Sequence, residues 1–429
     1  MTLRTDLRAV RKLISNLFAT RRNRAELARV RAQHPPPPPG EIEIAVYFAD
    51  SKVNLYQIRQ WYRPLQELAR HHRVAIISRT PSAVLSLWNE SGLPTVYARS
   101  VADLERFIAA HPLKIVLYVN QNAKNFQMFR YGGLWHTFIN HGESDKMYMT
   151  TNQFKAYDYA LVAGQAALDR LSHALWNFDL DRRVIPIGRP QADHFDGGPD
   201  LPADGRVVVL YSPTWEGDRA AAAYGSIATH GERLVEALLS TGRHRVIYRP
   251  HPLSGVIDPE TARANRAIMA AIERANATDA RAGHIVDTGG ELGWQLAIAD
   301  VAITDISAMV YDRLATGKPI VITRPVAPEA DVDERGYLGA AEWMTADDSR
   351  DVVAILDRVL TDEDARLRLQ HWSAHHFGDT SPGAATERFH TAIEHLIAQW
   401  HVHAAIHVGD VNDLEADPDD VELDEEPGE

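Results

Sequence analysis

The chain has 429 residues, of which 45% are apolar and 24% charged, the composition of a globular protein long enough for two domains. It contains no cysteine, which excludes a disulfide scaffold, a thiolate zinc site and a cysteine nucleophile. Its net charge of −13 argues against nucleic acid as a partner, because phosphate backbones bind basic surfaces.

Charge is distributed unevenly along the sequence. Residues 1–34 contain nine basic and two acidic side chains, and their apolar residues recur at helical spacing. This pattern predicts a basic amphipathic helix, which lies either on an anionic membrane surface or on the acidic body of its own chain. The five prolines of residues 35–39, within the segment 35–40, predict a stiff extended spacer. Residues 409–429 contain eleven acidic and no basic side chains, which predicts a disordered tail.

No run of 18 or more apolar residues is present in the sequence, which argues against a membrane-spanning helix. The first residues also lack the apolar core and cleavage site of a signal peptide. We therefore expect a cytoplasmic protein, peripheral on the inner face of the plasma membrane where the basic helix binds lipid.

Between the spacer and the tail, short apolar runs alternate with amphipathic segments, of which Leu55–His71 and Val101–Ala110 have helical patterns. Two successive series of this kind predict an α/β protein with two doubly wound parallel sheets, over residues 41–190 and 191–408. The first series of predicted strands comprises Ile42–Phe48, Val74–Ser78, Lys114–Val119, His136–Asn140 and Tyr159–Val162. The second comprises Val207–Tyr211, Val246–Tyr248, His284–Val286, Val301–Thr304 and Pro319–Thr323.

The first candidate for chemistry follows the predicted strand His136–Asn140. Ligands of doubly wound sheets bind outside the carboxyl ends of the strands, so residues just after strands are the candidates. His141 lies there with Gly142 beside it, which lets backbone and ligand approach, and such a histidine suits a general base. A histidine that merely caps a turn is the alternative.

Two further candidates follow strands of the second series. Thr214 and Trp215 come after Val207–Tyr211, where the hydroxyl can donate a hydrogen bond to a phosphate oxygen and the indole can line a pocket. A core tryptophan after a strand ended by proline is the alternative. Arg249 and His251 come after Val246–Tyr248; two prolines fix the backbone around the histidine, and the planar guanidinium matches phosphate oxygens.

The fourth candidate is the segment Thr304-Asp305-Ile306-Ser307, between a predicted strand and a helix. Ser307 would lie at the start of the helix, where free N–H groups favour an anion. A plain helix cap made by Asp305 or Ser307 uses the same geometry, so both interpretations stay open.

Several motifs are absent from the sequence. It contains no phosphate-binding G-x-x-x-x-G-K-[ST] loop, no G-x-G-x-x-G after the first strand, no H-E-x-x-H and no G-x-S-x-G. These absences argue against a P-loop kinase, a nicotinamide-dependent dehydrogenase, a zincin and an α/β-hydrolase.

Taken in order, the candidate segments resemble the CDP-glycerol glycerophosphotransferase family, the teichoic-acid primases and polymerases. The resemblance covers roughly residues 110–330. It departs from the family at Asn140, where members often carry tryptophan, and at Ala308, where many have a second serine. The matching segments are His141-Gly142 with Lys146, Gly188-Arg189-Pro190 with Asp193, Tyr211-Ser212-Pro213-Thr214-Trp215, Arg249-Pro250-His251-Pro252 and Thr304-Asp305-Ile306-Ser307.

The resemblance implies a GT-B-like fold, with two Rossmann-like domains facing a cleft and the nucleotide held mainly by the C-terminal one. It also implies that a helix over Ala384–Val402 crosses back onto the N-terminal domain.

The implied reaction transfers glycerol phosphate, or a related polyol phosphate, from a CDP-linked donor such as CDP-glycerol to a lipid-linked or glycan acceptor, with release of CMP. By the resemblance His141 takes the proton of the acceptor hydroxyl, and His251 holds or protonates the departing phosphate. No cofactor or metal ligand is predicted, and a bound Mg²⁺ stays open. The residues implied to bind substrate and diphosphate are Gly142, Lys146, Thr214, Arg249, Thr304, Asp305 and Ser307.

Two other functions stay open on the sequence. A GT-B glycosyltransferase acting on a nucleotide sugar would share the fold and the diphosphate site, and it would release a nucleoside diphosphate instead of CMP. A catalytically silent membrane scaffold would use only the basic helix, the spacer and the acidic tail, and it would bind no nucleotide.

Overall fold

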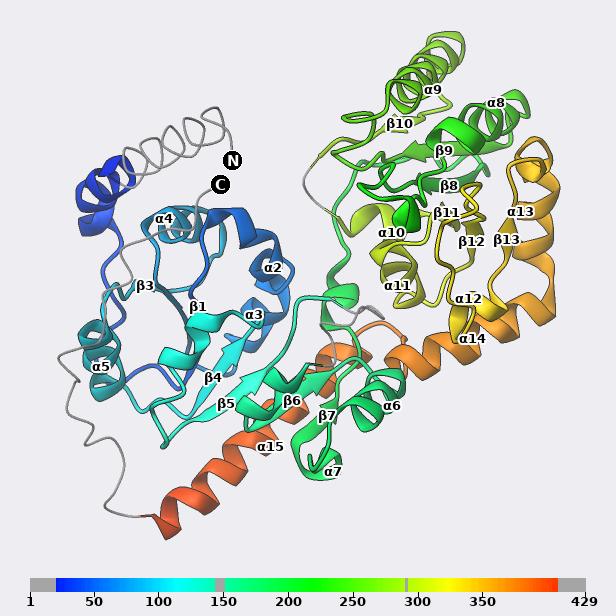
Figure 1. Cartoon of the computed structure of the whole chain (residues 1–429). Coiled ribbons are helices and arrows are strands. Elements are labelled where there is room, and N and C mark those ends of the chain that lie inside the picture. The colour runs from blue at the N-terminus through cyan, green and yellow to red at the C-terminus, as the bar shows by residue number, and fades with distance from the viewer. Residues whose placement is uncertain (1–20, 143–150, 290–291, 408–429) are drawn as a thin grey trace, which may run out of the picture. The chain divides into compact units, whose positions relative to one another are not determined.

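The computed structural model describes residues 21–142, 151–289 and 292–407 (Figure 1). Residues 21–30 are helical and residues 35–38 form no regular element. Arg31–Gln33 form a turn of 3-10 helix. Residues 1–20 of the predicted basic helix and the predicted acidic tail lie outside the described residues.

The chain divides into two compact units. The first takes in the described residues up to Val162, residues 167–187 and those from Thr386 onward; the second consists of residues 163–166 and 188–385. This division differs from the expected C-terminal domain of residues 191–408, because the last helix packs in the core of the first unit.

Within the described residues, the first unit has a seven-stranded parallel sheet of order β3-β2-β1-β4-β5-β6-β7. Strands β1 and β2 are buried along their whole length, as expected for a sheet covered on both faces. The order reverses between β1 and β4, so the loops after these two strands diverge. The strands are β1 Ile44–Phe48, β2 Val74–Ser78, β3 Thr95–Tyr97, β4 Ile115–Tyr118, β5 Trp135–Phe138, β6 Tyr159–Val162 and β7 Val184–Pro186.

Two apolar cores cover the faces of this sheet. Helix α5 packs in one of them, and α2, α3, α4 and α15 pack in the other. In α15, Phe389, Ile393 and Leu396 are completely buried, which confirms the expected return of the chain to the first unit. The helices are α2 Leu55–Arg59, α3 Tyr62–Leu68, α4 Pro81–Glu90, α5 Val101–Ala110, α6 Gln165–Ala174, α7 Leu180–Arg183 and α15 Ala384–Ile406.

The described part of the second unit contains a six-stranded parallel sheet of order β10-β9-β8-β11-β12-β13. Its order reverses between β8 and β11. The two parallel sheets confirm the predicted fold class. The strands are β8 Val207–Ser212, β9 His244–Tyr248, β10 Ile285–Val286, β11 Val301–Thr304, β12 Ile320–Thr323 and β13 Trp343–Met344.

Helices again cover both faces of the second sheet. Helices α8, α9 and α13 pack in one core, and α10, α11 and α14 contribute to the others. The helices are α8 Glu232–Ser240, α9 Pro259–Thr278, α10 Trp294–Ile298, α11 Ala308–Leu314, α12 Tyr337–Ala340, α13 Val352–Thr361 and α14 Glu363–Phe377.

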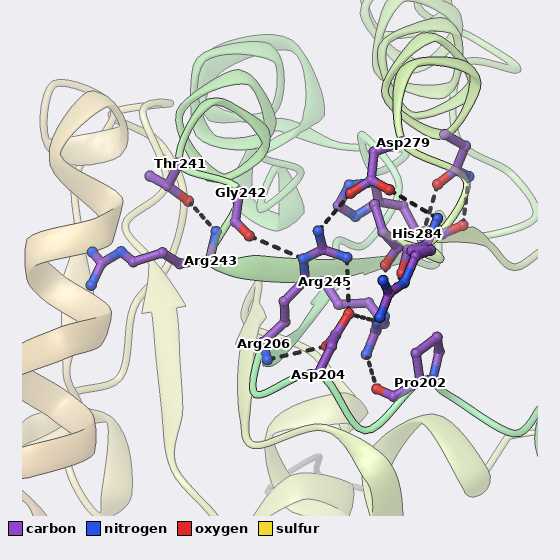
Figure 2. A network of polar contacts seen from close by, with 12 residues as sticks. Pro202, Asp204, Arg206, Thr241, Gly242, Arg243, Arg245, Asp279 and His284 are labelled. Atoms are coloured by element: carbon purple, nitrogen blue, oxygen red, sulfur yellow. Dashed lines mark hydrogen bonds and ion pairs between the residues drawn. The ribbon is translucent and has the colours of Figure 1, made fainter.

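A buried arginine fixes the segment that leads into the second sheet (Figure 2). Arg245, on β9, is 1% exposed and donates to the carbonyl of Pro202 at 3.1 Å and to Asp204 at 2.8 Å. Asp204 also pairs with Arg206 at 3.0 Å, and Arg206 reaches Asp279 at 2.6 Å. The guanidinium is therefore compensated by a carboxylate and carbonyl oxygens, which a buried cation requires.

Candidate functional site

Three loops of the second unit begin at neighbouring strand ends. Ser212 at the end of β8 pairs with Thr304 at the end of β11, and Tyr211 pairs with Tyr248 at the end of β9. The predicted segments around Thr214, Arg249 and Asp305 therefore leave the same edge of one sheet. This edge lies at the reversal of strand order, where doubly wound sheets bind ligands.

Asp305 joins these loops from the inside. Its carboxylate is completely buried and accepts hydrogen bonds from the backbone N–H of Thr214 at 2.8 Å and of Ser226 at 3.0 Å, and from the hydroxyl of Thr323. Burial raises its pKa to about 6, against the effect of these hydrogen bonds. The carboxylate therefore faces the protein interior, where it links the loops after β8 to β12; its predicted part in diphosphate binding stays a prediction.

The other two predicted site residues of this segment also make local contacts. Thr304 is 1% exposed, and its hydroxyl donates to the carbonyl of Asp305 at 3.2 Å. Ser307 is the N-cap of α11 and accepts from the N–H of Met309 at 3.3 Å. Ser307 therefore caps the helix, as one of the two open interpretations predicted.

Arg249 is an ion-paired side chain. Its guanidinium pairs with Asp287, which follows β10 and also accepts from the amide of Gln295. The sequence suggested Arg249 as a cation for phosphate and missed Asp287, whose only signal was its place directly after a predicted strand. A phosphate that binds Arg249 would share the guanidinium with this carboxylate.

His251 has a defined tautomer. Its Nδ1 accepts a hydrogen bond from the backbone N–H of Leu253 at 3.1 Å, so in the neutral ring the proton is on Nε2. The ring stacks on Trp215, with centroids 6.4 Å apart and planes at 24°. Burial lowers the pKa of His251 and so favours the neutral form, although the nearby carboxylate of Glu216 acts in the opposite direction. The neutral ring therefore presents an N–H donor at Nε2.

His141, in the first unit, has the opposite tautomer. It lies after β5, and its Nδ1 lies 3.0 Å from the carbonyl oxygen of Val119, which can only accept. Nδ1 therefore carries the proton, and Nε2 retains the lone pair that a general base needs. The ring of Tyr56 meets His141 edge-on at 5.9 Å.

The glycine beside His141 leaves open space. A Cβ placed on Gly142 would meet no atom within 4 Å, so no described side chain fills the volume next to it. Asn140 adopts a φ of 55°, in the left-handed region, and turns the chain directly before His141. Lys146 lies outside the described residues.

The sequence missed a polar cluster at the same edge of the first sheet. Asp50, which is 7% exposed, follows β1 and accepts from the amides of Asn120 at 3.2 Å and Asn122 at 2.8 Å. Asn120 also donates to Gln57 at 2.6 Å. Single asparagine residues form no recognisable sequence motif. Only their places directly after strands could have indicated that these side chains lie close together.

The structure does not bring all predicted site residues into one unit. Thr214, Arg249, His251, Thr304, Asp305 and Ser307 belong to the second unit, and His141 and Gly142 to the first. Among the residues that the structure describes, no group of three or more histidine, aspartate or glutamate side chains could hold a metal ion. No helix within the described ranges is both long and apolar enough to cross a membrane.

Comparison with known proteins identifies one family. The family model described as CDP-Glycerol:Poly(glycerophosphate) glycerophosphotransferase matches residues 136–394. These residues include every predicted site residue. No curated protein matches the chain.

Solved structures share the fold. A Listeria monocytogenes protein described as a UDP-N-acetylglucosamine 2-epimerase aligns with a TM-score of 0.55 and 13% identity, over 84% of this chain and 98% of that one. The wall teichoic acid polymerase TagF, in a variant soaked with CDPG, aligns with a TM-score of 0.52 and 15% identity, over 92% and 98%. Another TagF variant aligns with a TM-score of 0.53 and 13% identity, over 94% of this chain and 100% of that one. These likenesses confirm the GT-B-like fold.

Proposed function

Because the chain belongs to the CDP-glycerol:poly(glycerophosphate) glycerophosphotransferase family, we propose that it transfers glycerol phosphate, or a related polyol phosphate, from a CDP-linked donor to an acceptor hydroxyl. The acceptor belongs to a cell-envelope glycan or lipid. The predicted basic helix within residues 1–34 would keep the enzyme at an anionic membrane, where such a lipid-linked acceptor lies.

In the proposed reaction the acceptor oxygen attacks the phosphorus that carries the polyol. A new P–O bond forms there, and the bond to the oxygen of the CMP phosphate breaks. The acceptor proton goes to Nε2 of His141, and the leaving CMP oxygen takes the electron pair and accepts a hydrogen bond from Nε2 of His251. The first contact is general-base catalysis by a neutral imidazole, and the second stabilises the charge that develops on the leaving phosphate.

The observation that carries this proposal is the complementary tautomers of the two histidines. Val119 makes Nδ1 of His141 a donor, and Leu253 makes Nδ1 of His251 an acceptor. One ring therefore offers a lone pair at Nε2 to take the acceptor proton, and the other offers an N–H at Nε2 to hydrogen-bond the leaving oxygen. Thr214, Arg249 and Lys146 remain the proposed ligands of the diphosphate, whose charge must be compensated during transfer.

The test is CMP release from CDP-glycerol and CDP-ribitol, with and without a membrane-lipid extract and with and without EDTA. We expect acceptor-dependent release that falls about 10²-fold or more in His141→Ala and in His251→Ala. The matched controls His173→Ala and His371→Ala replace exposed histidines of the first and second units and should retain full turnover.

Near-normal turnover in both active-site variants would refute the mechanism. Release of a nucleoside diphosphate from a nucleotide sugar, in place of CMP, would favour a glycosyltransferase. A protein that binds no nucleotide at all would favour the scaffold.

A further inference from the structure

The apolar side chains of the loop that carries His251 are largely exposed and do not pack it against the core. It connects β9 to α9, and its side chains Leu253, Val256 and Ile257 are 44%, 66% and 58% exposed. Within the loop, the N–H of Ser254 donates to the carbonyl of His251 at 2.9 Å. Polar contacts to other segments must therefore hold this backbone in place.

Glu216, from the loop after β8, supplies such contacts. Its carboxylate accepts three backbone hydrogen bonds, from Gly255 at 2.9 Å, Ile257 at 3.1 Å and Asp258 at 3.1 Å. Although burial alone would raise the pKa of Glu216, bonds from backbone N–H groups hold it below its ordinary value. The carboxylate is therefore ionised, and each bond is charge-assisted.

The backbone on either side of Glu216 packs closely against other backbone of the same loop. Gly217 has a φ of +83°, and a Cβ there would lie 2.5 Å from the carbonyl oxygen of Ala222. A Cβ on Gly225 would lie 3.0 Å from the carbonyl oxygen of Trp215. Trp215, directly before Glu216, stacks on His251, so one short segment contacts both the ring and the loop that carries it.

We infer that Glu216 is a positioning residue for His251: its bonds to Gly255, Ile257 and Asp258 fix the loop in which the Leu253 N–H sets the tautomer of the imidazole. The catalytic consequence rests on the proposed function, in which His251 donates from Nε2. The effect on the tautomer does not, because it concerns the free protein.

The direct experiment is ¹⁵N NMR of the histidine side chains in the full chain, with the His251 signal assigned by its loss in His251→Ala. In the unaltered protein we expect His251 to show one dominant tautomer with the proton on Nε2. In Glu216→Ala the signals of its two ring nitrogens should move toward each other as the ring samples both tautomers. Glu216→Gln keeps one acceptor oxygen and should give an intermediate shift.

The matched control is Asp218→Ala. Asp218 is exposed two residues further along the same loop, so its removal makes the same change in charge near the site. Its His251 signal should stay as in the unaltered protein. Should Glu216→Ala fail to fold, Glu216→Gln still decides the question, and an unchanged His251 signal in a folded Glu216 variant would overturn the inference.

Turnover gives a second readout. We expect Glu216→Ala to lower kcat about 10-fold with a smaller change in KM, and Glu216→Ala/His251→Ala to be no slower than His251→Ala alone. Fully multiplicative losses would overturn the proposed link to His251. Normal turnover in His251→Ala, together with a shifted tautomer in Glu216→Ala, would refute the proposed function and leave the positioning role intact.

Discussion

Replacing Arg189 by methionine should leave the carboxylate of Asp312 buried in the second unit without its cation. Nη1 of Arg189 lies 2.6 Å from Oδ1 of Asp312, and the two residues are 7% and 6% exposed. Burial raises the pKa of Asp312, and the guanidinium opposes this shift. Removing one partner of such a pair costs about 3–5 kcal/mol, because the remaining charge keeps its desolvation penalty.

The same substitution should lower the melting temperature of the second unit. For a unit of roughly 200 residues, each kcal/mol corresponds to about 2–4 °C, so we expect a decrease of about 6–20 °C in calorimetry. Asp312→Leu alone should cost a similar amount, and Arg189→Met/Asp312→Leu should be far more stable than the sum of the two losses predicts.

The loss of stability in Arg189→Met should become smaller as the pH falls. Without the guanidinium, the pKa of Asp312 in the folded state rises further above its value in the unfolded chain, so the folded state binds the additional proton. Its stability relative to the unaltered protein must then improve as the pH falls. A loss below about 1 kcal/mol, additive losses in the double variant, or a deficit that grows at low pH would each refute this reasoning.

Two further predictions concern buried polar groups of the second unit. Asp305→Ala should leave the N–H groups of Thr214 and Ser226 without their acceptor, which costs about 1–3 kcal/mol each. Urea unfolding should therefore show a free energy of unfolding lower by about 2–6 kcal/mol. A decrease under about 1 kcal/mol would mean that water replaces the carboxylate. Burial lowers the pKa values of His230 and His284 to about 4, so below pH 6.5 the unfolded chain takes up protons that the folded chain does not. Stability should therefore fall by up to about 1.4 kcal/mol per pH unit for each histidine between pH 6.5 and 4, and equal urea midpoints at pH 7 and pH 5 would contradict this.

The central strands of both sheets could be predicted because they are continuous apolar runs. Val74–Ser78, Tyr159–Val162 and Val301–Thr304 have the predicted bounds. The sequence missed β3, β7 and β13, which have only two or three residues and lie at or near sheet edges, where burial imposes no long apolar run.

The predicted helix over Leu55–His71 is interrupted in the structure, because α2 ends at Arg59 and α3 begins at Tyr62. Pro64 lies in the first turn of α3, where its missing N–H needs no partner. Periodicity alone continues across such a break, since the apolar residues on both sides keep helical spacing.

The sequence predicted those residues of the candidate site that directly follow strands. His141, Thr214 and His251 follow strands in the structure as expected. The partners Asp287 and Glu216 were not predictable, because each pairs with a residue about 40 positions away through loops whose paths the sequence pattern does not specify.

The position of α15 has a consequence for synthesis of the protein on the ribosome. The strands of the first unit emerge first, yet Phe389, Ile393 and Leu396, which complete one face of its core, emerge after the whole of residues 188–385. The second unit can therefore finish folding before the first, although chains generally fold from their N-terminal end. Until the last helix arrives, the apolar side chains that α15 covers stay exposed on the nascent first unit, although α2, α3 and α4 already pack on the same face.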